Sequence, residues 1–83
     1  MSPQPTYAEY LGRAIAAMRH ERGMKRRELA VASGVSYPYV SELENGVKGG
    51  SVATIVALAS ALRVAPSAIL MRAEAIAAAQ EGR

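Results

Sequence analysis

Apolar residues recur every three or four positions in five separate stretches of this 83-residue sequence. That spacing is typical of one buried face of an α-helix. The predicted helices cover residues 6–22, 25–33, 36–45, 51–62 and 66–80. Ala is the commonest residue, and Trp and Phe are absent. Because Ala favours helices, whereas strands draw on β-branched and aromatic residues, the predicted fold class is all-α.

Polar and conformationally special residues mark where these helices begin and end. Thr6 and Glu9 form the pattern of a capping box at the start of the first helix. Gly34 is placed to end the second helix, and Pro38 lies in the first turn of the third, where its missing N–H is tolerated. Further boundary signals are Ser36, Asn45-Gly46, Ser51 and Pro66.

The length allows one domain, expected over residues 6–80, with flexible ends at 1–5 and 81–83. The absence of Cys excludes a disulfide framework and a thiolate metal site. No run of about 18 apolar residues is present to span a membrane. The first residues lack the basic-then-apolar pattern of a secretory signal. The expected location is therefore cytoplasmic, in association with the nucleoid.

The formal charge of +3 is unevenly distributed along the chain. Residues 13–27 contain six basic residues against the single acid Glu21, a local charge of +5, so the remainder sums to −2. Such an excess indicates an anionic partner, with nucleic acid first and a membrane surface second. A solvated helix face that only aids solubility has the same composition, and charge alone leaves both interpretations open.

No catalytic constellation is present. His20 is the only His, and the chain has no Asp to orient it. Ser residues without such a base are unactivated, and the seven scattered Glu show no metal-ligand spacing. We therefore expect no enzyme activity, no metal, no cofactor and no small-molecule ligand.

Residues 26–43 carry the most functional information. Two short predicted helices meet at a turn containing Gly34, and Ala30 lies where they must approach closely. Apolar residues that fix the crossing angle are Leu29, Val35, Val40 and Leu43. This arrangement is typical of a helix-turn-helix, whose second helix presents its first residues to a DNA groove. An ordinary αα-hairpin uses the same positions, so the pattern alone leaves it open.

A more specific likeness extends over residues 11–70. The residues that carry it are Leu11-Gly12, Ile15, Met18-Arg19, Leu29-Ala30, Gly34-Val35-Ser36, Val40-Ser41, Leu43-Glu44-Asn45-Gly46, Leu58-Ala59 and Ala61-Leu62. Together they resemble the phage-repressor/Cro-like (XRE-type) helix-turn-helix family. The resemblance implies a compact five-helix, lambda-repressor-like domain that binds DNA, generally as a dimeric transcriptional regulator. The single short domain also resembles the small controller proteins of restriction–modification systems.

The resemblance implies roles for individual residues. Arg19 and Glu44 fall on a structural salt bridge, and loss of one partly buried partner would destabilise the fold by about 3–5 kcal/mol. The positions that face DNA bases are Tyr37, Pro38 and Glu42. The positions that contact or flank the DNA backbone are Lys25, Arg26, Ser36, Tyr39, Ser41, Asn45 and Lys48.

Two departures from the family pattern stand out. Lys25 occupies the N-cap of the second helix, where Ser, Thr or Asn is usual, and its side chain has no acceptor. The missing cap lowers the stability of the fold by about 1 kcal/mol. A cation that binds phosphate beside the free N–H groups of the helix start accounts for Lys at this position. Arg63 replaces the Gly usual between the fourth and fifth helices, which implies either a strained left-handed residue or a different turn.

The recognition helix lacks the residues that make bidentate base contacts. Tyr37 can offer its hydroxyl to a base edge or a phosphate, and Pro38 can contact a thymine methyl group. Glu42 can accept from a cytosine amino group or instead orient a neighbouring basic side chain. Because few side chains of this helix can contact bases directly, DNA shape and phosphate geometry are expected to supply part of the specificity.

The fifth predicted helix carries a stripe of alternating large and small residues, Ile69, Ala73, Ile76 and Ala77. The stripe favours an isologous dimer contact, and packing onto the fourth helix is the alternative. The whole pattern predicts a sequence-specific, homodimeric regulator on an inverted-repeat operator, with helix 36–45 in the major groove of double-stranded DNA. The alternative is a protein-interaction module, such as a bridging or antitoxin-like factor, built on the same scaffold.

Overall fold

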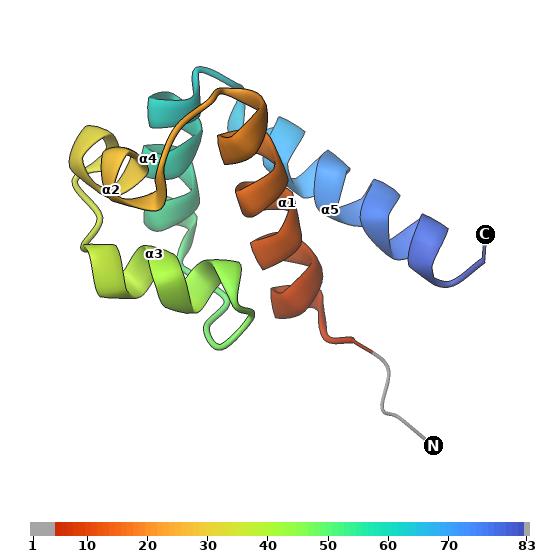
Figure 1. The fold of residues 1–83 in the computed structure, drawn as a ribbon. Helices are drawn as coiled ribbons and strands as arrows, with labels where there is room; N and C mark the ends of the chain where they lie inside the picture. Colours follow the sequence, from red (N-terminus) through yellow and green to blue (C-terminus); the bar gives the residue numbers. More distant parts are fainter. Residues whose placement is uncertain (1–4, 83) are drawn as a thin grey trace.

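The computed structural model describes residues 5–82 and contains five helices within that range (Figure 1). They are α1 (Tyr7–Glu21), α2 (Arg26–Ser33), α3 (Tyr37–Glu44), α4 (Val52–Leu62) and α5 (Pro66–Gln80). The predicted all-α fold is confirmed, with each boundary within one residue of its expected position. Most of the predicted flexible ends, residues 1–4 and 83, lie outside the described residues. Glu81 and Gly82 continue α5 as a hydrogen-bonded turn.

Side-chain caps explain where the helices start. The Thr6 hydroxyl accepts from the Glu9 N–H at 3.2 Å, and the Glu9 carboxylate accepts from the Thr6 N–H at 3.4 Å. The Ser51 hydroxyl accepts from the Thr54 N–H at 3.1 Å. Such bonds satisfy donors that the first turn of a helix leaves open. The capping residues have extended backbone angles and lie just outside their helices.

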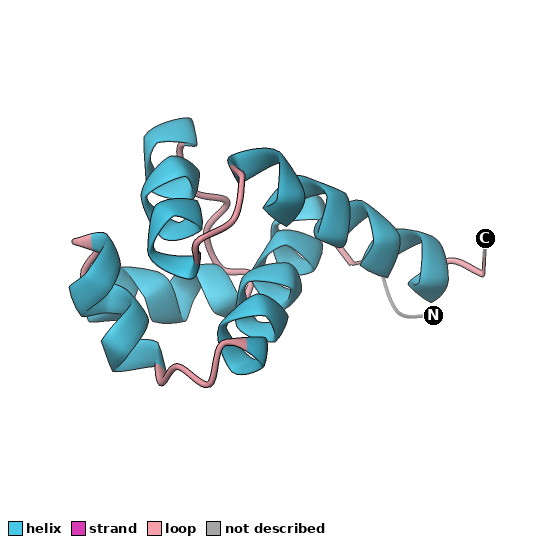
Figure 2. Cartoon of the chain, turned by 90° about the horizontal axis from the view of Figure 1, so that it is seen from above, coloured by secondary structure: helices cyan, strands magenta, loops and turns pink. Residues whose placement is uncertain are grey.

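One cluster of buried apolar residues joins all five helices. α1 packs against α3 and α5, α2 packs against α3 and α4, and α4 packs against α5. The long helix α5 runs beside α1, as Figures 1 and 2 show. The core residues are Tyr10, Leu11, Ala14, Ile15, Met18, Leu29, Ala30, Val40, Leu43, Ile55, Leu58, Ala59, Leu62, Ile69 and Ala73.

Gly12 allows α1 to touch the C-terminal turn of α3. A Cβ at this position would overlap the backbone carbonyl oxygen of Leu43 and would come within 2.8 Å of that of Glu44. Carbonyl oxygens of a helix backbone cannot move aside as a flexible side chain can. The close approach therefore fixes α3 directly on α1.

Arg63 adopts the left-handed conformation, with φ 59° and ψ 44°. Its N–H donates to the Ser60 carbonyl oxygen at 3.1 Å, and the Val64 N–H donates to that of Ala59 at 3.0 Å. The turn thus keeps the geometry that normally calls for Gly. Of the two options open from the sequence, the strained residue is the one found.

The predicted dimer stripe is wrong at two of its four positions. Ile69 and Ala73 have no exposed surface within the single chain, because they pack into the core where α5 lies against α1 and α4. Ile76 and Ala77 are half-buried against the same core. The stripe therefore serves the domain's own packing, mainly onto α1 rather than onto α4 as the alternative proposed.

Among residues 5–82, no single helix is long and apolar enough to cross a membrane. α4 and α5 reach the required length and hydropathy only as a pair, and that pair is bent by 97°.

Candidate nucleic-acid interface

α2 and α3 form a compact unit joined by a turn at Gly34, which has a φ of 76°. The first turn of α3 is well defined, because the Ser36 hydroxyl accepts from the Tyr39 N–H at 3.3 Å and Pro38 occupies a position that needs no donor. α3 lies on the far side of α1 from α5 (Figure 1). The first residues of α3, Tyr37 and Pro38, are exposed.

The start of α2 is capped in an unexpected way. Lys25 is the N-cap residue, and its side chain makes no capping bond. Instead, the Glu28 carboxylate accepts from the Lys25 N–H at 2.6 Å. This bond compensates in part for the missing N-cap acceptor. The Lys25 side chain is left exposed to solvent beside the first turn of α2.

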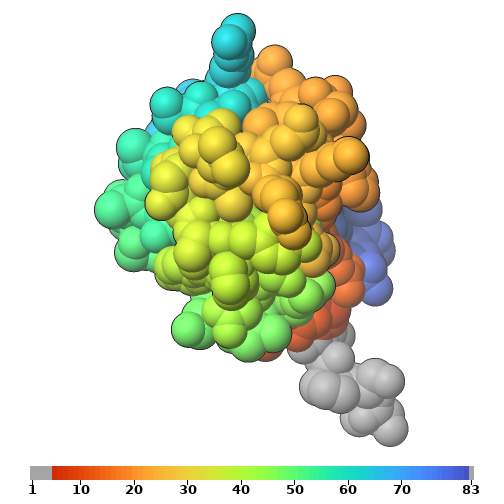
Figure 3. All heavy atoms as spheres, turned by 60° about the vertical axis from the view of Figure 1, so that its left-hand side comes forward, coloured from red at the N-terminus to blue at the C-terminus, as the bar shows by residue number. Residues whose placement is uncertain are grey.

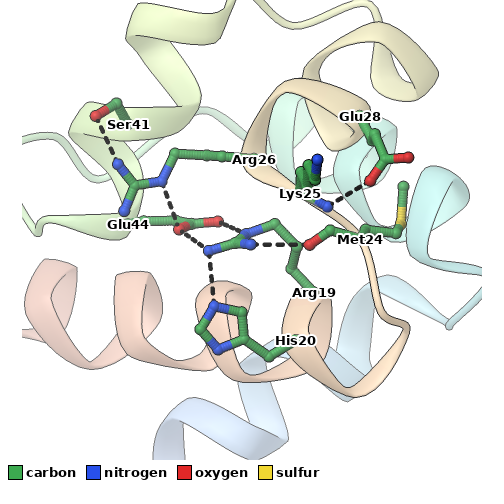
Figure 4. A network of polar contacts seen from close by, with 8 residues as sticks. All are labelled: Arg19, His20, Met24, Lys25, Arg26, Glu28, Ser41 and Glu44. Carbon is green, nitrogen blue, oxygen red and sulfur yellow. Dashed lines mark hydrogen bonds and ion pairs between the residues drawn. The ribbon is translucent and has the colours of Figure 1, made fainter.

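A buried ion pair joins α1 to α3 beneath these exposed residues. The Arg19 Nε and Nη2 atoms donate to the two Glu44 carboxylate oxygens at 2.6 and 2.9 Å. A further Arg19 nitrogen donates to the Met24 carbonyl oxygen at 2.9 Å, and the His20 ring nitrogen Nε2 lies 3.1 Å from Nη2 (Figure 4). The hydrogen bond to Glu44 raises the pKa of Arg19 further above its ordinary value.

Arg26 joins the same carboxylate from α2. Its Nε donates to Glu44 Oε1 at 3.0 Å, and its Nη1 donates to the Ser41 hydroxyl at 3.0 Å (Figure 4). The sequence singled out Arg26 and Ser41 as separate backbone contacts and did not anticipate that they bond to each other. The side chain of Arg26 remains 32% exposed, so it is held but not enclosed.

At the tip of α3, Arg27 and Tyr37 are neighbours. The Arg27 guanidinium carbon lies 5.4 Å from the centre of the Tyr37 ring, over its face. Arg27 was not among the predicted site residues. Its membership of the basic run Lys25-Arg26-Arg27 is the sequence signal that pointed to it.

At the other end of α3, Glu42 and Lys48 approach each other. The Lys48 Nζ lies 3.6 Å from Glu42 Oε1 and 5.7 Å from the centre of the Tyr39 ring. Glu42 therefore has a basic neighbour, which was one of the two roles that the sequence left open for it. Asn45, the C-cap residue of α3, lies between Glu42 and Lys48 in the sequence and is exposed.

These residues belong to one face, which we call the α2–α3 surface. Figure 3 shows α2 in orange and yellow beside α3 in yellow-green, with the following loop in green below. The members of the α2–α3 surface are Lys25, Arg26, Arg27, Ser36, Tyr37, Pro38, Tyr39, Ser41, Glu42, Asn45 and Lys48. Residues 10–70 match the family described as "Helix-turn-helix domain".

The chain belongs to this helix-turn-helix family.

Relatives with known names agree with this membership. The transcriptional repressor RghR of Bacillus subtilis is 37% identical over 76 residues, which are 90% of this chain and 56% of the repressor. A regulator of Mycobacterium tuberculosis is 37% identical over 62 residues, covering 75% of this chain and 44% of that protein. This chain thus spans about half the length of these relatives.

Solved helix-turn-helix structures superpose closely on the chain. The clp gene regulator ClgR of Corynebacterium glutamicum has a TM-score of 0.90 and 38% identity, covering 96% of this chain and 85% of that one. The restriction-modification controller protein C.AhdI of Aeromonas hydrophila has a TM-score of 0.73 and 29% identity, covering 75% of this chain and 94% of that one. The compact lambda-repressor-like arrangement predicted from the sequence is confirmed by these likenesses.

Proposed function

We propose that this chain is a sequence-specific, double-stranded-DNA-binding transcriptional regulator that acts as a homodimer on an inverted-repeat operator. The observation that carries the proposal is the α2–α3 surface. It gathers Lys25, Arg26 and Arg27 at the start of α2. Arg27 lies over Tyr37 at the exposed start of α3, and Arg26 bonds to Ser41 in the last turn of α3, so that cations for phosphate flank residues able to meet base edges. α3 (Tyr37–Glu44) is the helix placed in the major groove.

The residues divide into two proposed roles. Tyr37, Pro38 and Glu42 face the bases. The residues that contact or flank the sugar-phosphate backbone are Lys25, Arg26, Ser36, Tyr39, Ser41, Asn45 and Lys48, to which we add Arg27. Both sets are positioned by helices that pack on one core, which keeps the register between backbone and base contacts.

For the dimer we propose a different face from the buried stripe of α5. The exposed apolar side chains Val52, Val56, Leu70 and Met71 lie on α4 and α5. Three of them, Val52, Val56 and Leu70, border a hollow of about 230 Å³ whose lining residues are Gly50, Ser51, Val52, Ile55, Val56, Pro66 and Leu70. None of these residues is ionisable. A two-fold contact places such a face against its own copy without bringing like charges together, which favours a second copy as its occupant.

Duplex binding measured at a series of salt concentrations tests the proposal. We expect a linear fall of log K with log salt, with a slope of about −0.9 for each phosphate neutralised. Lys25→Ala should make the slope shallower by about that amount. Arg13→Ala is the control, because Arg13 lies on α1 and bonds to Gln80 of α5, outside the α2–α3 surface.

Two results would overturn the proposal. One is the absence of duplex binding by the wild-type chain at about 50 mM salt, where electrostatic affinity is strong. This is the outcome expected for the alternative, a protein-interaction module that uses the same tyrosine-bearing tip. The other is binding without sequence preference in a selection from a random duplex library.

A further inference from the structure

Two guanidinium groups share one carboxylate under the α2–α3 surface. The Glu44 side chain is 1% exposed and is the only acid within residues 5–82 that forms an ion pair with Arg19 or Arg26. Two cations therefore meet one anion, and the cluster retains one positive charge. Buried or half-buried charges are normally paired, so the remaining positive charge of the cluster favours the binding of a second anion.

The hydrogen-bond donors show where that anion would bind. Arg19 is enclosed, and its donors reach Glu44, Met24 and His20. Arg26 uses two of its five N–H groups, one on Glu44 and one on Ser41. No acceptor among residues 5–82 takes the other three, which belong to the two Nη atoms of a side chain that reaches the surface.

We infer that Ser41 and Glu44 are positioning residues that hold the Arg26 guanidinium in place for one backbone phosphate of the bound duplex. The inference rests on the proposed function. The phosphate supplies the second anion and accepts charge-assisted bonds from the Nη atoms. A guanidinium that is already fixed loses less side-chain freedom when the phosphate arrives. Ser41 thus acts through Arg26 rather than by touching DNA itself.

Ser41→Ala is the most direct test, because it removes one acceptor and leaves every charge in place. We expect duplex affinity to fall about three- to tenfold. The slope of log K against log salt should stay unchanged, since the number of neutralised phosphates is the same. Ser60→Ala, an exposed serine on α4, is the control and should leave affinity as it is. Thermal denaturation of each variant verifies that it is folded.

A double-mutant cycle then separates positioning from direct contact. Arg26→Lys keeps the charge but cannot make the bond pattern of a guanidinium, so it should keep the slope and lose affinity. In that background Ser41→Ala should have no further effect, because there is no guanidinium left to position. Arg26→Ala should make the slope shallower by about 0.9.

The outcomes distinguish this inference from the proposed function. If the wild-type chain binds duplexes with sequence preference and Ser41→Ala has wild-type affinity, the inference is wrong and the proposed function stands. An equal loss from Ser41→Ala in both the wild-type and the Arg26→Lys backgrounds would mean that Ser41 contacts DNA directly, which also overturns it. If the wild-type chain binds no duplex at low salt, both fail together.

Discussion

The Arg27 guanidinium lies over the face of the Tyr37 ring, with 5.4 Å between its central carbon and the ring centre. A cation at this distance is attracted by the ring's negative face. The contact joins α2 to the tip of α3 and places a charged group directly beside an exposed residue that we propose faces the bases. The side chain proposed to bind phosphate and the one proposed to face the bases are therefore in contact at this point.

This coupling predicts different effects for the two residues. Arg27→Ala should weaken binding to every duplex and make the salt slope shallower by about 0.9. Tyr37→Ala should change which sequences are selected from a random duplex library, and Tyr37→Phe isolates the contribution of the hydroxyl group. If Tyr37→Ala weakened all sequences equally, the placement of Tyr37 against the bases would be wrong.

Gly12→Ala should destabilise the fold by about 2–3 kcal/mol, because the added methyl group meets the carbonyl oxygens of Leu43 and Glu44. Urea denaturation measures the free energy of unfolding. Gly49→Ala is the matched control, since a Cβ there meets nothing within 4 Å and the backbone has no positive φ. Equal stability of the two variants would contradict the close packing of α1 on α3.

Arg63→Gly should stabilise the fold by about 1 kcal/mol, because Gly adopts the left-handed conformation without the steric penalty that Arg pays. Arg63→Ala retains a Cβ in the same conformation and should bring no such gain. The bond from Arg22 to the Arg63 backbone carbonyl is kept in both variants. Thermal denaturation of the three proteins side by side checks the order.

An exposed ion pair makes part of the stability depend on acidity. Hydrogen bonds from Arg72 at 2.8 and 3.0 Å lower the pKa of Glu21 below its ordinary value. A carboxylate with a lowered pKa in the folded state stabilises the fold above its unfolded pKa, and this contribution disappears as the pH falls through the folded pKa.

Glu21→Gln should accordingly be less stable than the wild-type chain at pH 7, and the difference should vanish once the pH has fallen below the lowered folded pKa of Glu21. Urea denaturation across this range measures it. Glu74→Gln is the control. Glu74 is exposed on α5, the helix that also carries Arg72, and it has no ion pair within residues 5–82. A difference between wild-type and Glu21→Gln proteins that grows on acidification would contradict the assignment.

Leu70→Glu should convert the proposed dimer to a monomer, because it places two carboxylates in the two-fold contact that we propose for α4 and α5. Light scattering reports the mass. Val31→Glu introduces the same charge at an exposed apolar position on α2, away from that face, and should leave the mass unchanged. A dimer that survives Leu70→Glu would place the contact elsewhere.

Local chemistry was enough to predict the helices from the sequence. The caps Thr6, Ser36 and Ser51 and the turn at Gly34 act within three or four residues, so each boundary can be recognised without knowing the rest of the fold. The pairing of Arg19 with Glu44 spans 25 positions and came from the family likeness rather than from any local pattern.

What escaped prediction depended on which surfaces meet. α5 has Ala on several sides, so its pattern does not reveal that Ile69 and Ala73 face α1 and α4 rather than a second copy. The contact of Arg26 with Ser41 and Glu44 likewise joins the first residue of α2 to the last turn of α3. The pattern of each helix taken alone cannot predict this contact, because it depends on how α2 and α3 pack against each other.

The close seating of α3 on α1 separates two tasks within one eight-residue helix. Val40, Leu43 and Glu44 hold the helix in place on its inner side, whereas Tyr37 and Pro38 on its outer side make no contribution to the core. The outer positions can therefore be exchanged for other side chains while the docking angle stays the same. If the proposed function holds, a few substitutions on the outer side of α3 would change the sequence that the domain selects, without altering how α3 packs on α1.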